Sequence, residues 1–217
     1  MKQIALVVEG QTEELFVREV LAPQLAARGI FLTPFIPVTS QTAHGRHKGG
    51  ARWSGYRKLA NKLAHEGHWH RIGVLLDLYG CPSDAPGRQG AGSGREYHRE
   101  LMDSLAQDLN AGGQRARILP HVFLHEFEAL VLAALDAGST VVPEKAARDL
   151  RKVLADFQGD PELVNGGEST SPSHRIMAAW DGYTKTVDGI RVIADVPFDA
   201  ILERCPSFAG WLEDLLT

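Results

Sequence analysis

Residues 3–13, QIALVVEGQTE, decide the fold class of this chain. Residues 4–8 form an unbroken apolar run of strand length, which is typical of a strand buried on both faces of a parallel sheet. Glu9 and Gly10 end the run. Thr12 then offers a helix N-cap, and the acidic residues after it suit the positive end of a helix dipole. The stretch therefore predicts a buried strand followed directly by a helix.

The same strand-and-helix pattern continues along the chain. Apolar runs of strand length alternate with segments of helical periodicity; the strands are expected at residues 3–8, 31–38, 71–77 and 118–124. This alternation predicts an α/β fold with a mostly parallel, Rossmann-like sheet flanked by helices. Two later helices are expected, at residues 143–157 and 201–216. We therefore predict an α/β domain over residues 1–138 and a small helical part, packed on it, over residues 139–217.

Composition limits the classes of protein that the chain can belong to. With 217 residues, 44% of them hydrophobic, the chain can bury a sizeable core. No apolar run reaches the roughly 18 residues of a membrane span, and residues 1–10 lack signal-peptide features, so we expect a cytoplasmic protein without membrane contact. A net charge of −4 argues against a wide basic surface that coats DNA. It leaves room for a nuclease with an acidic metal site.

Acidic residues follow three of the predicted strands. They are Glu9, Asp77, and the pair Glu126 and Glu128. Because the carboxyl ends of parallel strands share one edge of a sheet, these side chains are expected to converge. Converging carboxylates repel one another unless a divalent cation lies between them, and oxygen donors favour Mg²⁺ or Mn²⁺ over Zn²⁺. The alternative for each acid taken alone is a helix cap or a charge at a helix N-terminus.

Three segments resemble the motifs of Toprim domains, the metal-binding modules of topoisomerases, primases and OLD-type nucleases. LVVEGQTE at residues 6–13 resembles the first motif, LLDLYG at 75–80 stands where an Asp-x-Asp motif belongs, and HEFE at 125–128 resembles the third acidic motif. The resemblance implies that Glu9 and Asp77 are catalytic and bind metal. It also implies that Glu126 or Glu128 completes the metal site.

The later part of the chain adds to this resemblance. PSHR at residues 172–175 and YTK at 183–185 are similar to segments of an uncharacterised family of bacterial Toprim-like proteins. The resemblance implies a catalytic Lys185 and a nucleic-acid-binding Arg175. The alternative is a solvated charge, or a salt bridge to Asp181 or Asp188. Related genes often lie beside ATPase genes in mobile or anti-phage regions, which implies an ATPase partner.

The sequence departs from the Toprim pattern at Tyr79, where a second Asp is expected. A neutral phenol is a poor ligand for Mg²⁺. Four alternatives stay open: Asp84 substitutes for the missing ligand, Glu126 and Glu128 compensate, one metal binds alone, or catalysis has been lost.

A basic segment follows the second predicted strand. Residues 39–53 are expected to form a mobile loop, in which Arg46, His47, Lys48 and Arg52 suit a phosphate backbone. Trp53 and Tyr56 nearby suit stacking on a base. The alternative is a solvated loop without a ligand.

Together these features predict a Mg²⁺- or Mn²⁺-dependent phosphodiesterase that acts on nucleic acid, DNA in preference to RNA, as the effector of a bacterial anti-phage or mobile-element system with an ATPase partner. One alternative is a non-catalytic binding or regulatory subunit of an ATPase complex, and another is a small-molecule phosphatase. The oligomeric state, a homodimer included, stays open.

Overall fold

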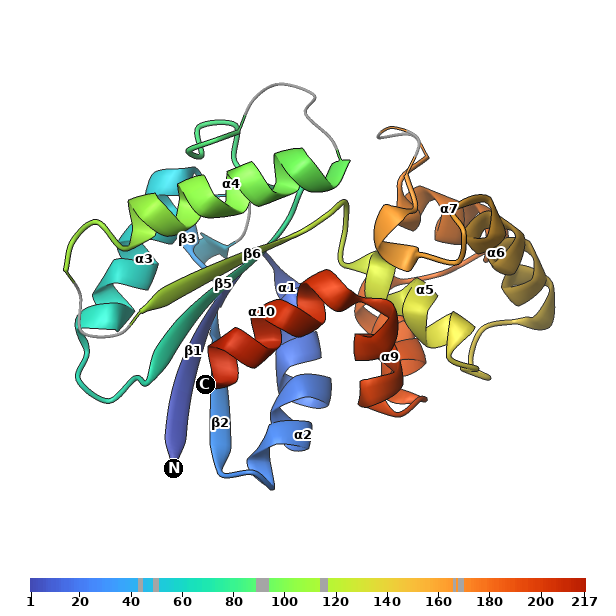
Figure 1. Cartoon of the computed structure of the whole chain (residues 1–217), viewed down its shortest axis with the longest axis horizontal. Coiled ribbons are helices and arrows are strands. Elements are labelled where there is room, and N and C mark those ends of the chain that lie inside the picture. The colour runs from blue at the N-terminus through green and yellow to red at the C-terminus, as the bar shows by residue number, and fades with distance from the viewer. Residues whose placement is uncertain (43–44, 49–50, 89–93, 114–116, 166, 168–169) are drawn as a thin grey trace. The chain divides into compact units, whose positions relative to one another are not determined.

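The computed structural model of the chain (Figure 1) describes residues 1–42, 45–48, 51–88, 94–113, 117–165, 167 and 170–217. The chain forms two compact units. The first, here called the sheet unit, consists of Met1–Val122 and Trp211–Thr217. The second, the helical unit, consists of Phe123–Gly210. In sequence, the helical unit is therefore inserted into the sheet unit.

The core of the sheet unit is a four-stranded sheet with the order β2-β1-β5-β6. Strand β1 (Lys2–Val8) pairs in parallel with β2 (Ile30–Phe35) on one side and with β5 (Arg71–Asp77) on the other. Strand β6 (Ile118–Phe123) lies next to β5. The predicted class, an α/β fold with a parallel sheet between helices, is confirmed.

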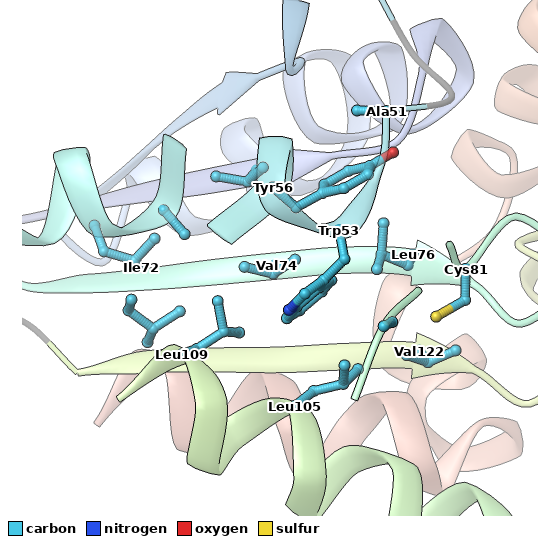
Figure 2. Packing of buried hydrophobic residues seen from close by; sticks show 14 of the residues in the cluster. Ala51, Trp53, Tyr56, Ile72, Val74, Leu76, Cys81, Leu105, Leu109 and Val122 are labelled. Atoms are coloured by element: carbon cyan, nitrogen blue, oxygen red, sulfur yellow. The ribbon is translucent and has the colours of Figure 1, made fainter. Parts of the chain in front are cut away.

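Helices α3 (Trp53–His65) and α4 (Gly94–Leu109) cover one face of this sheet. Figure 2 shows how their apolar side chains meet the strands: Trp53 of α3 and Leu105 of α4 pack with Val74 and Leu76 of β5. The helical stretch between β1 and β2 consists of α1 (Gln11–Phe16), the π-helical η1 (Val17–Leu21) and α2 (Ala22–Ala26).

The end of helix α10 (Pro206–Leu216) packs on β1 and β5 of the sheet unit. A Cβ atom at Gly73 would lie 3.0 Å from Cζ2 of Trp211 and would overlap Leu6, so only glycine leaves room for the helix here. The indole Nε1 of Trp211 donates to the carbonyl of Leu119 at 3.1 Å. The ammonium of Lys2 donates to the carbonyl of Leu216 at 2.7 Å.

Residues 38–48 differ from the prediction. In place of a mobile loop, strands β3 (Val38–Thr42) and β4 (Gly45–Lys48) form an antiparallel pair. Glycines and charges in this segment favoured a loop, but backbone pairing requires neither apolar side chains nor a buried face. The β-branched Val38, Thr39 and Thr42 favour the extended backbone that such pairing uses.

The helical unit is built around α5 (Glu128–Asp136), whose residues Ala129–Leu135 are all buried. An apolar surface all round the helix needs neighbours on every side. Among the described residues, the unit also contains the helices α6 (Glu144–Asp156), η2 (Pro161–Leu163), α7 (Pro172–Ala179), η4 (Lys185–Gly189), α8 (Ile190–Ala194) and α9 (Phe198–Arg204). Because α5 packs with α6 to α9, the observed units divide at residues 122/123 rather than at the predicted residue 138.

The helix predicted over residues 201–216 is interrupted. Helix α9 ends at Arg204, and α10 begins at Pro206. Proline has no N–H to continue a helix and disfavours a helical residue before it, but it is well placed at a helix start. Among the described residues, no helix combines the length and the apolar character that crossing a bilayer requires.

Candidate functional site

The order of the strands creates a switch point in the sheet unit. The chain places β2 on one side of β1 and then β5 on the other, so the direction in which the sheet grows reverses between β1 and β5. In open α/β sheets, ligands bind outside the carboxyl ends of the strands at such a switch point. Val8 is in register with Leu75, so Glu9 and Asp77 stand at adjacent strand ends.

The structure places Glu9 beside the backbone of Asp77. A carboxylate oxygen of Glu9, Oε2, accepts a hydrogen bond from the backbone N–H of Asp77 at 3.3 Å. A Cβ atom at Gly80 would overlap the carboxylate of Glu9, so the absence of a side chain at this position forms a cradle for that carboxylate. Two carboxylates are oxygen donors of the kind that Mg²⁺ and Mn²⁺ prefer. The two residues fit a divalent cation in their chemistry.

Glu13, the second acid of the first motif, has a structural task. Its Oε2 accepts a hydrogen bond from the backbone N–H of Gly10 at 2.9 Å, which closes the N-terminus of α1. This is the glutamate half of a capping box. Glu13 therefore fixes the turn that follows Glu9.

Asp84 also caps a helix. Its Oδ1 accepts a hydrogen bond from the backbone N–H of Trp53, the first residue of α3, at 3.0 Å. Of the alternatives for the ligand missing at Tyr79, substitution by Asp84 would therefore require that cap to open.

Cys81 lies close to the candidate site but is not an activated nucleophile. Burial raises the pKa of the Cys81 thiol to about 11, and the negative charge of Glu9 acts in the same direction. A thiol with such a pKa is protonated at neutral pH, and reactive cysteines depend on the thiolate.

In the helical unit, Glu126 is held by the start of α7. Its Oε2 accepts from the backbone N–H of Ser173 at 2.8 Å, and its Oε1 accepts from the Ser173 hydroxyl at 3.0 Å. Both oxygens thus satisfy donors near a helix N-terminus, where negative charge is favoured. The hydroxyl of Ser171 lies 3.2 Å from that of Ser173 and 2.9 Å from Nδ1 of His174. This is the cap alternative considered for strand-end acids.

Glu128 and Lys185 form an ion pair. Lys185 Nζ lies 2.8 Å from Glu128 Oε1, and the side chains are 41% and 1% exposed, respectively. Burial raises the pKa of Glu128, and Lys185 opposes that shift. The predicted catalytic lysine therefore has a carboxylate partner, which is neither Asp181 nor Asp188. Burial, followed by the charge of Glu128, raises the pKa of the neighbouring Tyr183.

The four predicted metal ligands thus fall into two pairs. Glu9 and Asp77 belong to the sheet unit, whereas Glu126 and Glu128 belong to the helical unit. Within the described part of the chain, no group of three or more His, Cys, Asp or Glu side chains is gathered as a metal cluster. A single centre that uses both pairs stays a prediction.

The predicted nucleic-acid-binding residues have different surroundings. The side chains of Arg46, His47 and Lys48 lie outside the described part of the structure, and Arg52 is exposed before α3. The guanidinium of Arg175 lies 5.3 Å from the centre of the Phe157 ring. It donates to the carbonyl of Thr170 at 2.7 Å and to that of Asn165 at 3.2 Å. Arg175 thus stabilises the segment before α7, and its part in binding nucleic acid stays a prediction.

Three residues shape these two places in roles that were not predicted from the sequence. Ser173 holds Glu126, Glu13 caps the turn after Glu9, and the hydroxyl of Tyr56 is buried beside the acidic first motif. For Glu13, the spacing Gly10-x-x-Glu is the signal of a capping box and was available. Ser173 lies 47 positions from Glu126, so no local pattern connects them.

The fold and these residues define an α/β protein with a carboxylate pair at the switch point of its sheet. Residues 8–216 match the family model described as "Domain of unknown function (DUF4276)", and the chain belongs to this family. The comparison with curated proteins gives no match. Among solved structures, the C-terminal region of the Burkholderia pseudomallei OLD protein has a TM-score of 0.45 and 14% sequence identity, with 100% of each chain covered.

Proposed function

We propose that this protein is a Mg²⁺- or Mn²⁺-dependent nuclease that hydrolyses phosphodiester bonds in nucleic acid, DNA in preference to RNA. The observation that carries the proposal is the pair of carboxylates, Glu9 and Asp77, at adjacent strand ends of the switch point. The Toprim resemblance of residues 6–13 and 75–80 supports the same assignment.

The chain's own residues would divide the work as follows. Glu9 and Asp77 would hold the cation, which when bound neutralises phosphate oxygens and activates water. Lys185 forms an ion pair with the buried Glu128 and is partly exposed, and it would meet the negative charge of a transition state. Arg46, His47, Lys48, Arg52 and Arg175 would contact the phosphate backbone.

The proposed setting is a bacterial anti-phage or mobile-element system in which an ATPase partner works with the nuclease. This part of the proposal depends on the resemblance of the later segments PSHR and YTK to Toprim-like proteins.

The test is cleavage of plasmid, single-stranded DNA and RNA by the purified protein in Mg²⁺ or Mn²⁺. Glu9→Gln and Asp77→Asn should each lower the cleavage rate at least about 100-fold, because each removes a charged ligand or general base. Glu14→Gln is the matched control: it changes an acid of the same motif whose partner is the exposed Arg18. Equal activity of Glu9→Gln and Glu14→Gln would refute the proposal.

A second candidate is a non-catalytic binding or regulatory subunit of an ATPase complex. The engagement of Glu126 by Ser173 and of Glu128 by Lys185 favours it, because both acids already have partners inside the helical unit. Stable association with an ATPase partner, together with no cleavage in Mn²⁺ even in that complex, would support this candidate.

A further inference from the structure

Tyr56 carries a polar group in the core of the sheet unit. It is 0% exposed and is among the largest fully buried side chains. The backbone N–H of Ala51 is directed at its phenolic oxygen, but among the described residues the O–H group has no acceptor. Buried polar groups are almost always hydrogen-bonded, and an unsatisfied one destabilises the fold. Phenylalanine would fill the same space without this cost, so packing alone does not require tyrosine here.

The hydroxyl is directed towards the carboxyl ends of the strands. Tyr56 stands in the first turn of α3, and Figure 2 shows its oxygen beside Ala51, at the end of the core where Leu76 and Cys81 lie. Burial first, and then the negative charges of Glu9 and Glu13, raise the pKa of Tyr56. The hydroxyl is therefore protonated at neutral pH and within electrostatic reach of the acidic first motif.

Strand alternation brings Tyr56 and Glu9 to the same face of the sheet. Ala5 and Val7 of β1 belong to the apolar cluster that contains Tyr56. Successive side chains of a strand point to opposite faces, so the face of Ala5 and Val7 continues to Glu9. A donor without an acceptor thus faces the region of a carboxylate that the fold places at the switch point.

We propose that Tyr56 is a positioning residue of a divalent-cation site: its hydroxyl holds the carboxylate of Glu9 when Glu9 and Asp77 bind the ion. The inference rests on the proposed metal site. Ligating carboxylates commonly accept such outer hydrogen bonds, and losing one typically weakens metal affinity about 10- to 100-fold. The unsatisfied hydroxyl then destabilises the metal-free protein, whereas its hydrogen bond to Glu9 stabilises the metal-bound protein.

The test is Tyr56→Phe, measured by Mn²⁺ titration and by thermal unfolding of the whole chain. Mn²⁺ affinity should fall about tenfold, while the metal-free melting temperature should rise by about 2–4 °C because an unsatisfied group is removed. Tyr97→Phe is the matched control, since the hydroxyl of Tyr97 has a partner in Arg88. It should leave Mn²⁺ affinity unchanged and should not raise the melting temperature.

An unchanged Mn²⁺ affinity in Tyr56→Phe, or a lower metal-free melting temperature, would overturn the inference. It fails separately from the proposed function. Cleavage by a Tyr56→Phe variant with normal Mn²⁺ affinity would support the proposed nuclease activity and refute the proposed role of Tyr56. A wild type whose Mn²⁺ affinity depends on Tyr56 but which cuts nothing would support the role of Tyr56 and refute the nuclease. A wild type that binds no Mn²⁺ would refute both.

Discussion

The sheet unit and the helical unit each contain two acidic residues at or soon after the end of a strand, but these carboxylates make different contacts in the two units. Glu9 and Asp77 end two neighbouring strands, and Glu9 lies in a cradle that only a glycine at position 80 permits. Glu126 closes the start of α7, and Glu128 forms an ion pair with Lys185. In this chain the difference comes from topology, because only the first pair stands where the sheet changes direction.

An acidic residue after a strand is therefore not by itself evidence for a metal ligand. In the helical unit, the carboxylates stabilise the fold. Glu126 accepts a hydrogen bond from a backbone N–H at a helix start, and Glu128 pairs with the partly buried ammonium of Lys185. In the sheet unit, the same chemical group stands at the switch point of the sheet. Substitutions in the helical unit should therefore act mainly on stability, and those in the sheet unit mainly on cation binding.

The largest effect on stability is expected for Lys185→Met, which removes the ammonium group that pairs with the buried carboxylate of Glu128. At neutral pH the free energy of unfolding should fall by about 2 kcal/mol, less than for a fully buried pair because Lys185 is 41% exposed. Urea unfolding measures this loss. Lys152→Met, which removes an exposed partner of Asp149, should change the free energy of unfolding far less.

The loss in Lys185→Met should depend on pH in a defined direction. Burial raises the pKa of Glu128 above its ordinary value of 4.5. The contribution of Glu128 to the free energy of unfolding is therefore fully favourable below pH 4.5 and is lost as the pH rises through the raised pKa. Removing Lys185 raises that pKa further. The gap between wild type and variant should therefore be small at about pH 4 and largest above about pH 7. An equal gap at both would show that the pair is not electrostatic.

Gly80→Ala should act on cation binding in the sheet unit. The added Cβ would overlap the carboxylate of Glu9, so Mn²⁺ affinity should fall about tenfold in a titration. Gly80 is not among the residues with positive φ, so alanine causes no backbone strain. Gly210→Ala is the control, because nothing lies within 4 Å of the added atom. Unchanged affinity in Gly80→Ala would shift the cation site away from Glu9.

Ser173→Ala should have the smallest effect. It removes the hydroxyl donor to Glu126 and keeps the backbone N–H, so the free energy of unfolding should fall by about 1 kcal/mol. Ser104→Ala, at an exposed hydroxyl that bonds Glu100, should cost less. Mn²⁺ affinity should not change in either variant. A weaker affinity in Ser173→Ala would mean that Glu126 belongs to the metal centre, and the contrast between the units would then disappear.

The strands and the carboxylate pair could be predicted from the sequence because local patterns encode them. The runs at residues 4–8 and 72–76 contain no polar side chain, and parallel strands bring their ends together wherever they are neighbours. The break before Pro206 was also predictable, since proline marks helix starts.

Other features depend on partners that no local pattern specifies. The bond from Ser173 to Glu126 and the ion pair of Lys185 with Glu128 join segments far apart in the chain. The orphaned hydroxyl of Tyr56 is visible only once its surroundings are known, because the sequence alone suggested an aromatic ring free to stack on a base. The β3–β4 pair combines weak β-propensity with a composition typical of loops.

The packing of the end of α10 on the sheet affects how the protein folds during synthesis. The contact from Lys2 to Leu216 spans 214 positions, and Trp211 covers Gly73 only after the helical unit has been made. Until then the apolar surface around Leu6 and Gly73 is bare on the nascent chain. Such late, long-range contacts slow folding and prolong exposure to aggregation and to chaperones. The sheet unit is thus begun first on the ribosome and finished last.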